Sequence, residues 1–419
     1  MESVALACED DRVSDVAGDA ATVRSWPLAA RTRALMRQFG LRAVKSRGQN
    51  FLIEEHVALG LAEAVCAGEA NRIVEVGAGL GALTLPLAET GRRVVAYEID
   101  RKLSAALQWL LAGLDNAEVR TEDFLKADLE KLRAGEAGER SLSPVWAAVG
   151  NLPYYITTPL LEKLFGAAPR AGLAEDGGEK KATPRTFERV VATMQAEVAE
   201  RILARPGSKQ YGPLTIFCRF HCETIERLFR IGPGAFLPRP EVDSVALLMV
   251  PRERQPEQIR DAEVFFTVVR AAFGHRRKTL GTALRTGLRG STDSYPPAPL
   301  PGREGGTETA DGDVRGSTAS YPLGRLRRPQ PLPGREGGTE TATSPPAPLR
   351  KRRGEKGSDG RRDTCPTRSV RGGVEAAIRD ALARASIDPE RRAETLSFDE
   401  FAALSNAFGE VTGLFNVSV

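Results

Sequence analysis

The chain has 419 residues, of which 41% are hydrophobic, and its formal net charge is +4. This length and apolar content are enough for one sizeable α/β core and a smaller second domain. No apolar run reaches the roughly 18 residues that a membrane-spanning helix needs. Acidic residues near the N-terminus stand where a signal peptide would carry positive charge, and they are Glu2, Glu9, Asp10 and Asp11.

The cysteines predict a reducing compartment, which we take to be the cytoplasm. There are five of them, an odd number, and their spacing shows no pairing pattern. Cys218, His221 and Cys222 suggest zinc at first sight, but no second ligand pair accompanies them. Because apolar residues alternate from Leu214 to Phe220, we interpret this run as a buried strand and expect no metal.

The first part of the chain divides into an extension and a main domain. We expect residues 1–30 to be a disordered N-terminal extension, and a helix is predicted from Ala29 to Phe39. Residues 31–255 alternate strand and helix patterns, which predicts a parallel sheet covered by helices on both faces. A polar stretch at 167–184 is interpreted as a surface loop of this domain.

A short apolar strand, Ile73 to Val76, runs into the glycine-rich turn Gly77-Ala78-Gly79-Leu80-Gly81, and a helix is predicted from Leu83 to Ala88. Such a turn lets a ligand approach the backbone closely. Its spacing is Gly-x-Gly-x-Gly, whereas dinucleotide sites use Gly-x-Gly-x-x-Gly to seat a pyrophosphate on the helix N-terminus. A cofactor without phosphate groups therefore fits this turn better.

Acidic residues follow the next two predicted strands. Glu98 closes the strand from Val94, where a carboxylate can accept hydrogen bonds from both ribose hydroxyls of a nucleoside. Dinucleotide enzymes also place an acid here, so Glu98 alone does not discriminate between the two cofactor classes. Asp123 follows a strand from Glu118 to Thr121 and can accept the amino group of a bound adenine beside Phe124, or it can simply cap a helix.

The apolar run Val145 to Val149 leads into Asn151-Leu152-Pro153-Tyr154, which suits methylation of an exocyclic amine on a base. Such an amine is a poor nucleophile because its lone pair is delocalised into the ring. The amide oxygen of Asn151 and the carbonyl oxygen of Leu152, in a turn that Pro153 helps to fix, can accept its two N–H protons and localise the lone pair. Tyr154 can stack on the base, which is worth roughly 1–3 kcal/mol. In isolation, Asn-x-Pro is also an ordinary strand-to-turn signal.

After Pro251 the pattern becomes helical, and apolar residues from Val264 to Phe273 recur every three or four positions. We assign residues 256–289 and 373–419 to a small C-terminal helical domain. Ser397 and Glu400 have the spacing of a helix-capping box. Between the two parts, residues 290–372 carry one twelve-residue sequence twice, at Pro299 to Ala310 and at Pro331 to Ala342, and we interpret them as a disordered insertion.

These motifs together resemble the ribosomal RNA adenine dimethyltransferase family, in particular its bacterial small-subunit branch. Further segments of the chain carry the same resemblance: Lys45 to Leu52, Gln195 to Arg201, Pro206 to Ser208, Tyr211 to Gly212, Pro233 to Ser244 and Phe273 to Leu280. The resemblance implies a Rossmann-like class I S-adenosylmethionine-dependent methyltransferase fold. It also implies dimethylation of N6 on two adjacent adenines in a hairpin loop near the 3′ end of small-subunit (16S) ribosomal RNA.

The resemblance also assigns roles to residues. It implies that S-adenosylmethionine contacts Asn50, Leu52, Gly77, Gly79, Glu98, Asp123 and Asn151. Tyr154 and Phe236 would be the platforms for the flipped adenine, since an enzyme that acts on a base must take it out of the stack. Arg276, Arg277 and Lys278 would contact RNA phosphates. We expect a monomer that binds no metal and no membrane.

Two alternatives remain at this point. A macrolide-resistance type of large-subunit (23S) adenine methyltransferase shares the glycine turn and the Asn-Leu-Pro-Tyr segment. A non-catalytic assembly or transcription factor could keep the same RNA-binding fold. The segment Gly234 to Pro240 and the C-terminal tail favour the small-subunit enzyme, and the intact Asn151 to Tyr154 segment favours activity.

Overall fold

We describe the fold from a computed structural model of the chain. The structure describes residues 19–44, 48–134, 146–153, 156–166, 186–275, 277–289 and 367–411. The expected loop at 167–184 and residues 290–366 of the expected insertion lie outside these ranges. The division into domains that we drew from the sequence therefore stays a prediction.

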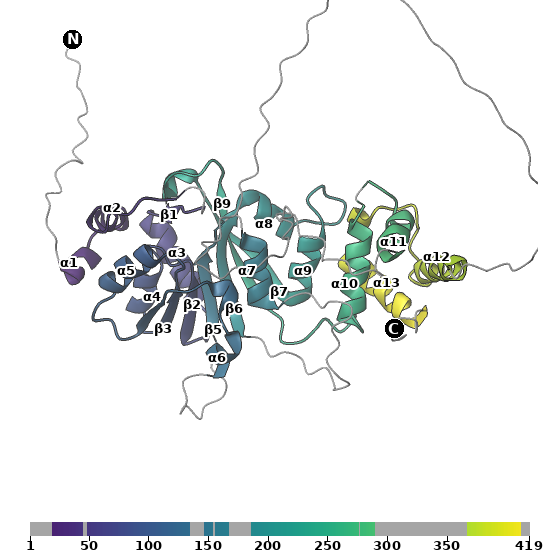
Figure 1. Cartoon of the computed structure of the whole chain (residues 1–419), viewed down its shortest axis with the longest axis horizontal. Coiled ribbons are helices and arrows are strands. Elements are labelled where there is room, and N and C mark those ends of the chain that lie inside the picture. The colour runs from purple at the N-terminus through teal and green to yellow at the C-terminus, as the bar shows by residue number, and fades with distance from the viewer. Residues whose placement is uncertain are drawn as a thin grey trace, which may run out of the picture. The chain divides into compact units, whose positions relative to one another are not determined.

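A seven-stranded sheet forms the centre of the fold (Figure 1). Its strands are β2 (Arg72–Val76), β3 (Arg93–Tyr97), β4 (Ala117–Arg120), β5 (Trp146–Asn151), β6 (Phe187–Gln195), β7 (Cys222–Ile231) and β9 (Ser244–Pro251). Their order is β4-β3-β2-β5-β6-β9-β7, and β4, β3, β2, β5 and β6 run parallel, while β9 is antiparallel to both of its neighbours. Val94, Val95 and Ala96 of β3 are all buried, as expected of a parallel strand that is covered on both faces.

Helices cover both faces of this sheet. The helices of the sheet region are α3 (Glu55–Cys66), α4 (Thr84–Glu89), α5 (Arg101–Leu110), α6 (Leu129–Ala134), α7 (Thr157–Phe165), α8 (Ala196–Ile202) and α9 (Pro213–His221). Apolar residues of α3, α4 and α5 pack against one face, and those of α6 to α9 pack against the other. The predicted α/β architecture, a mostly parallel sheet covered on both faces, is confirmed.

The chain enters the sheet region through two helices, α1 (Ala20–Arg24) and α2 (Leu28–Gln38). The predicted helix at 29–39 is thus confirmed, but the expectation that disorder extends to residue 30 is wrong. Asp19 caps α1 by accepting a hydrogen bond from the Thr22 N–H at 2.8 Å, and Val23 is 2% exposed. A capped helix with a buried apolar residue is part of the folded structure.

One strand prediction is wrong. The run from Leu214 to Phe220, which we interpreted as a buried strand, is helix α9. Pro213 begins the helix, and the Thr215 hydroxyl accepts a hydrogen bond from the Gly212 N–H at 3.2 Å. The helix is buried on most of its sides, so its apolar residues do not show the spacing of a helix with one apolar face. The described residues contain no cluster of three potential metal ligands, with Cys218 and Cys222 buried as free thiols.

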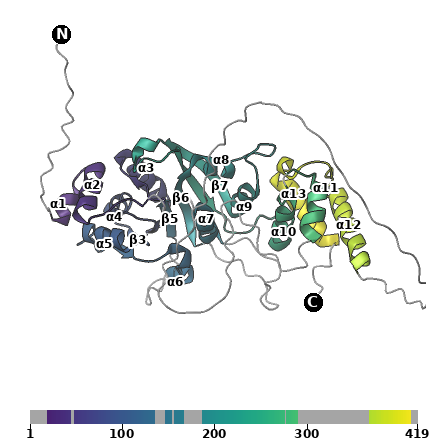
Figure 2. The same ribbon diagram turned by 45° about the horizontal axis from the view of Figure 1, so that its top comes forward.

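The C-terminal region is helical, as predicted. It comprises α10 (Ala262–Phe273), α11 (Leu280–Arg289), α12 (Thr367–Arg384) and α13 (Phe398–Val411), with a short 3-10 turn, η6 (Ala393–Thr395). Helix α12 begins at Thr367, so the last residues that we assigned to the insertion belong to a helix. Figure 2 shows α10, α11, α12 and α13 grouped together. Buried residues of these helices share one apolar cluster with one face of the sheet. None of the described helices is long and apolar enough to cross a membrane.

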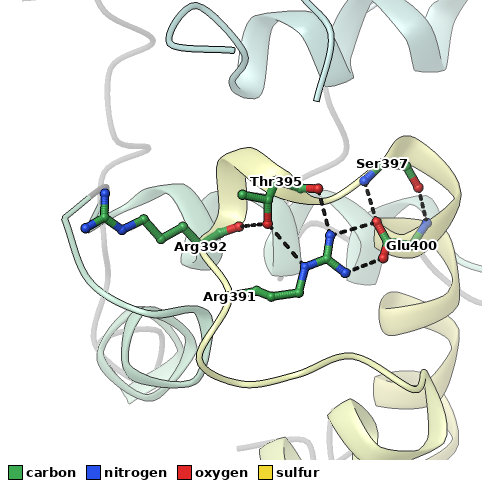
Figure 3. Close-up of polar contacts among 5 residues, drawn as sticks. All are labelled: Arg391, Arg392, Thr395, Ser397 and Glu400. Atoms are coloured by element: carbon green, nitrogen blue, oxygen red, sulfur yellow. Dashed lines mark hydrogen bonds and ion pairs between the residues drawn. The ribbon is translucent and has the colours of Figure 1, made fainter. Parts of the chain in front are cut away.

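The predicted capping box at the start of α13 is confirmed. The Ser397 hydroxyl accepts from the Glu400 N–H at 3.1 Å, and the Glu400 carboxylate accepts from the Ser397 N–H at 2.7 Å (Figure 3). Glu400 also pairs with Arg391, whose guanidinium donates to the Thr395 carbonyl at 2.7 Å. The hydrogen bond with Arg391 lowers the pKa of Glu400. This network fixes the turn that leads into α13.

Candidate active site

The predicted site residues gather at one edge of the sheet, where the parallel strands end. Gly77 follows β2, Glu98 follows β3, Asp123 lies just beyond β4, and Asn151 is the last residue of β5. Because these strands are parallel neighbours, their C-terminal ends lie side by side. This is the edge at which open α/β sheets bind their ligands.

The glycine turn has a backbone that other residues rarely adopt. Gly77, Gly79 and Gly81 have φ angles of +75°, +56° and +80°. The Gly77 and Ala78 N–H groups both donate to the Tyr97 carbonyl of β3, at 2.9 and 3.1 Å. A side chain on Gly77 would point at Pro153 and the Asn151 carbonyl, with its Cβ 3.9 Å from Pro153 Cδ and 4.0 Å from that oxygen. The missing side chain therefore leaves space between the glycine turn and the Asn-Leu-Pro segment.

Glu98 lies against the glycine turn. Its carboxylate accepts hydrogen bonds from the Gly79 N–H and from the Asp100 N–H, both at 2.8 Å, and the residue is 6% exposed. Burial raises the pKa of Glu98, while these two hydrogen bonds act in the opposite direction. The carboxylate is therefore held in a fixed position beside the turn, as a ribose acceptor must be.

Asp123 begins the short 3-10 helix η2 (Phe124–Lys126). One carboxylate oxygen accepts from the Leu125 N–H at 3.0 Å, so the capping role that we considered is present. Phe124 is buried, and its ring meets Tyr97 edge to face. A cap uses one of the two carboxylate oxygens, so capping and contact with an adenine amino group are compatible.

Asn151 is oriented by a contact that the sequence did not predict. Its amide nitrogen donates to the Asn50 carbonyl oxygen at 2.9 Å. A carbonyl accepts and cannot donate, so the NH₂ group must face Asn50 and the amide oxygen must point elsewhere. The next residue is also fixed, because the Leu152 N–H donates to the Thr193 carbonyl at 3.0 Å. Asn151 thus presents a single oriented acceptor.

Two segments that are distant in the sequence meet beside Asn151. Strands β1 (Phe51–Leu52) and β8 (Phe236–Leu237) pair antiparallel, with Leu52 opposite Phe236. The Ile53 N–H also donates to the Ala235 carbonyl at 2.8 Å. The structure therefore brings together both segments that the resemblance placed at the site.

Phe236 does not have the environment that we expected. Its side chain is 3% exposed and packs in the same apolar cluster as Leu52. In this structure the ring therefore packs inside the fold, and its role as an adenine platform stays a prediction. Tyr154, the other expected platform, lies outside the described residues.

Two residues of the site were not found from the sequence. Glu75 lies within β2 and is 2% exposed, with the Thr84 hydroxyl donating to its carboxylate at 2.5 Å. Burial raises its pKa to about 8, and the nearby Glu98 adds to this rise. A Cβ on Gly150 would lie 2.6 Å from the Val76 carbonyl, so only glycine allows β5 to approach β2 this closely just before Asn151. The sequence signal for Glu75 was an acid inside an apolar strand, and the signal for Gly150 was a glycine at the end of a strand.

The charged side chains at these strand ends fit a cofactor that lacks phosphate groups. Glu98 and Asp123 bring carboxylates to two successive strand ends, where their negative charge would repel a phosphate group. The predicted RNA contacts lie elsewhere, in the turn between α10 and α11. Arg277 and Lys278 are exposed there, and Arg276 lies outside the described residues.

Comparison with known proteins decides the family. The sequence model of the family described as "Ribosomal RNA adenine dimethylase" matches residues 40–296. The chain belongs to this family. The resemblance inferred from the motifs is therefore confirmed.

Individual relatives agree with the family. A protein of Moorella thermoacetica named "Ribosomal RNA small subunit methyltransferase A" is 44% identical over 256 residues, which are 61% of this chain and 83% of that protein. A protein of the same name from Geobacillus thermodenitrificans is 39% identical, over 60% of this chain and 78% of its own length. The crystal structure of a dimethyladenosine transferase from Plasmodium falciparum has a TM-score of 0.52 at 18% identity, covering 86% of this chain and 98% of that one, and it supports the fold.

Proposed function

We propose that this chain transfers methyl groups from S-adenosylmethionine to N6 of two adjacent adenines in the RNA of the small ribosomal subunit. Family membership supports adenine dimethylation, and the small-subunit names of the relatives favour this substrate over large-subunit RNA. The observation that carries the proposal is the orientation of Asn151. Its bond to the Asn50 carbonyl leaves the amide oxygen free to accept, at a strand end whose backbone carbonyl lies beside the glycine turn.

The residues of the site would hold the cofactor through its nucleoside. The Glu98 carboxylate would accept from ribose hydroxyls, and Asp123 would accept from the adenine amino group. Asn50 and Leu52 belong to the segment that contacts Asn151, and they would hold the cofactor from there. When bound, S-adenosylmethionine supplies an electrophilic methyl group on a sulfonium. The acidic lining would favour that positive charge by simple Coulomb attraction.

The same residues would activate the target amine by position alone. The oxygens of Asn151 and Leu152 would accept its two N–H protons, and Tyr154 would stack on the base. We assign no general base, because attack on a sulfonium does not require a deprotonated amine. His221 is unsuited to the role of general base, because Phe217, Phe220 and Phe266 enclose it. Burial also lowers its pKa to about 4.

We also propose that the enzyme is monomeric and cytoplasmic, the compartment that its five cysteines predict. Arg276, Arg277 and Lys278 would contact phosphates of the RNA without reading its sequence. A non-catalytic role is not favoured, since the Asn-Leu-Pro-Tyr segment is intact.

The test is incubation with labelled S-adenosylmethionine and unmethylated ribosomal subunits, followed by nucleoside analysis of each RNA. We expect N6,N6-dimethyladenosine in small-subunit RNA only, whereas label in large-subunit RNA would contradict the proposal. Asn151→Ala should abolish transfer, whereas cofactor affinity in calorimetry should fall much less than the rate. Asn71→Ala is the matched control, because Asn71 is exposed just before β2, at the opposite edge of the sheet. Wild-type transfer by Asn151→Ala would refute the role of its oxygen.

A further inference from the structure

Helix α2 presents a basic face that the site described above does not use. Residues 20–53 contain seven Lys or Arg residues and no Asp or Glu. Among them, Arg33, Arg37 and Arg42 are exposed in the structure. Helix α2 precedes residue 40, where the match to the family model begins, so the family motifs assign nothing to Arg33 and Arg37.

The arginines of α2 divide into two kinds. Arg31 is 5% exposed, and its guanidinium donates to the Arg24 and Trp26 carbonyls at 3.1 and 3.2 Å, so it has a structural role. Arg33 and Arg37 form no hydrogen bond or ion pair within the part of the chain that the structure describes. They are four residues apart on one face of the helix, where like charges repel and weaken a helix slightly. Packing and helix stability therefore do not account for the pair.

The buried face of α2 fixes where these arginines lie. Leu35 belongs to the same buried cluster as Phe51 and as Ala78 and Leu80 of the glycine turn. Phe39 packs edge to face on Trp109 of α5, with ring centroids 5.8 Å apart. Figures 1 and 2 both show α2 beside α1 at the end of the fold that holds α4 and α5. Helix α2 is thus a rigid part of the region around the glycine turn.

The segment after α2 continues to the site itself. The Val44 N–H donates to the Gln49 side chain at 2.9 Å, which closes the turn before Asn50. Asn50 in turn accepts the hydrogen bond that orients Asn151. The exposed Arg42 precedes this turn by two residues, so basic side chains continue from α2 towards the point where a substrate base would enter.

We propose that the exposed face of α2, with Arg33, Arg37 and Arg42, binds the phosphate backbone of the RNA stem that flanks the target adenines. The proposal rests on the proposed function, because an adenine in the site brings its flanking phosphates to this edge of the sheet. Unpaired guanidinium groups on a rigid helix suit phosphates, which they bind in a fork geometry. Such contacts position the RNA and do not read its sequence.

The test compares two double variants with the same change of charge. Arg33→Gln/Arg37→Gln removes the proposed contacts. Lys131→Gln/Arg254→Gln is the control, because both residues are exposed and lie near the opposite edge of the sheet, beside the start of β5 and after the end of β9. The probes are a synthetic RNA hairpin with two adjacent adenines in its loop, unmethylated small subunits, and vesicles containing phosphatidylserine.

We expect the α2 double variant to bind the hairpin about tenfold more weakly than wild type at 0.1 M salt, with a slope of log K against log salt that is smaller by about 2. The KM for small subunits should rise while kcat stays unchanged, and the control should show a smaller effect in each assay. RNA affinity and salt slope equal to those of the control would overturn the proposal. A loss of vesicle binding with unchanged RNA binding would overturn it in favour of a membrane.

Cofactor binding is measured on every variant as a check of folding. Because α2 packs near the glycine turn, a misfolded variant would no longer bind the cofactor. If the double variant fails that check, the single variants Arg33→Gln and Arg37→Gln replace it. Hairpin binding is read without methyl transfer. Failure of the wild type to methylate small subunits would therefore count against the proposed function alone.

Discussion

Gly77→Ala should weaken cofactor binding while the protein still folds, because its new methyl group would enter the space between the glycine turn and Pro153. The Cβ would lie 3.9 Å from Pro153 Cδ and 4.0 Å from the Asn151 carbonyl, which is ordinary contact and no clash. The folding cost is therefore that of a left-handed φ of +75° in a residue with a side chain, about 1–2 kcal/mol. The bound cofactor, however, would meet a methyl group where the backbone was open.

Gly91→Ala is the matched control for this change. Gly91 has a φ of +77°, and no atom lies within 4 Å of the position that its Cβ would take. It lies in the turn between α4 and β3, away from the strand-end site. Both variants should lose about the same stability in urea denaturation, since both carry the same backbone strain. Only Gly77→Ala should lose affinity for S-adenosylmethionine in calorimetry, by tenfold or more if the clash costs about 1.4 kcal/mol. Equal cofactor affinities would refute the placement of the cofactor against Gly77.

Three further predictions concern burial, capping and the repeat segment. Glu75→Gln should stabilise the fold by up to about 5 kcal/mol above pH 8, because burial raises the pKa of the Glu75 carboxyl from 4.5 to about 8. The wild type keeps this stability below pH 4.5, where the carboxyl is protonated, and loses it as the pH rises to 8. A gain in urea denaturation that does not vary with pH would contradict burial as its cause. Ser397→Ala should cost about 1 kcal/mol in chemical denaturation by removing the bond to the Glu400 N–H, and an unchanged midpoint would show that the cap contributes nothing. Deleting residues 290–366 and joining the ends with a short linker should preserve methyl transfer and lower the cost of loop closure by about 2 kcal/mol, because that cost grows only with the logarithm of loop length. An unfolded or inactive protein at low salt would show that the segment is structural.

The strand-end site could be predicted from the sequence because each of its parts is local. A short apolar run followed by glycines, an acid or Asn-Leu-Pro identifies a strand and the residue at its end without any long-range information. The parallel order of the strands then places Gly77, Glu98, Asp123 and Asn151 together. The capping box of Ser397 and Glu400 was predictable for the same reason, since both partners lie within one turn of helix.

The features that were missed depend on tertiary packing. Helix α9 is apolar on most of its sides, so the pattern of its residues does not distinguish a buried helix from a buried strand. The packing of Phe236 with Leu52 could not be predicted either, because nothing in the segment around Phe236 indicates it. The raised pKa of Glu75 likewise depends on neighbours that only the folded chain supplies.

The pairing of β1 with β8 joins the segment assigned to the cofactor to the segment assigned to the base. Leu52 and its neighbour Asn50 belong to the segment assigned to the cofactor, and Phe236 belongs to the segment assigned to the base. Asn151 is bonded to the Asn50 carbonyl, so the acceptor for the amine is held by the cofactor segment. A shift of either segment would therefore move the acceptor relative to both reactants. If the reaction depends on position and uses no general base, as we propose, this pairing would contribute to the rate by holding the acceptor in place.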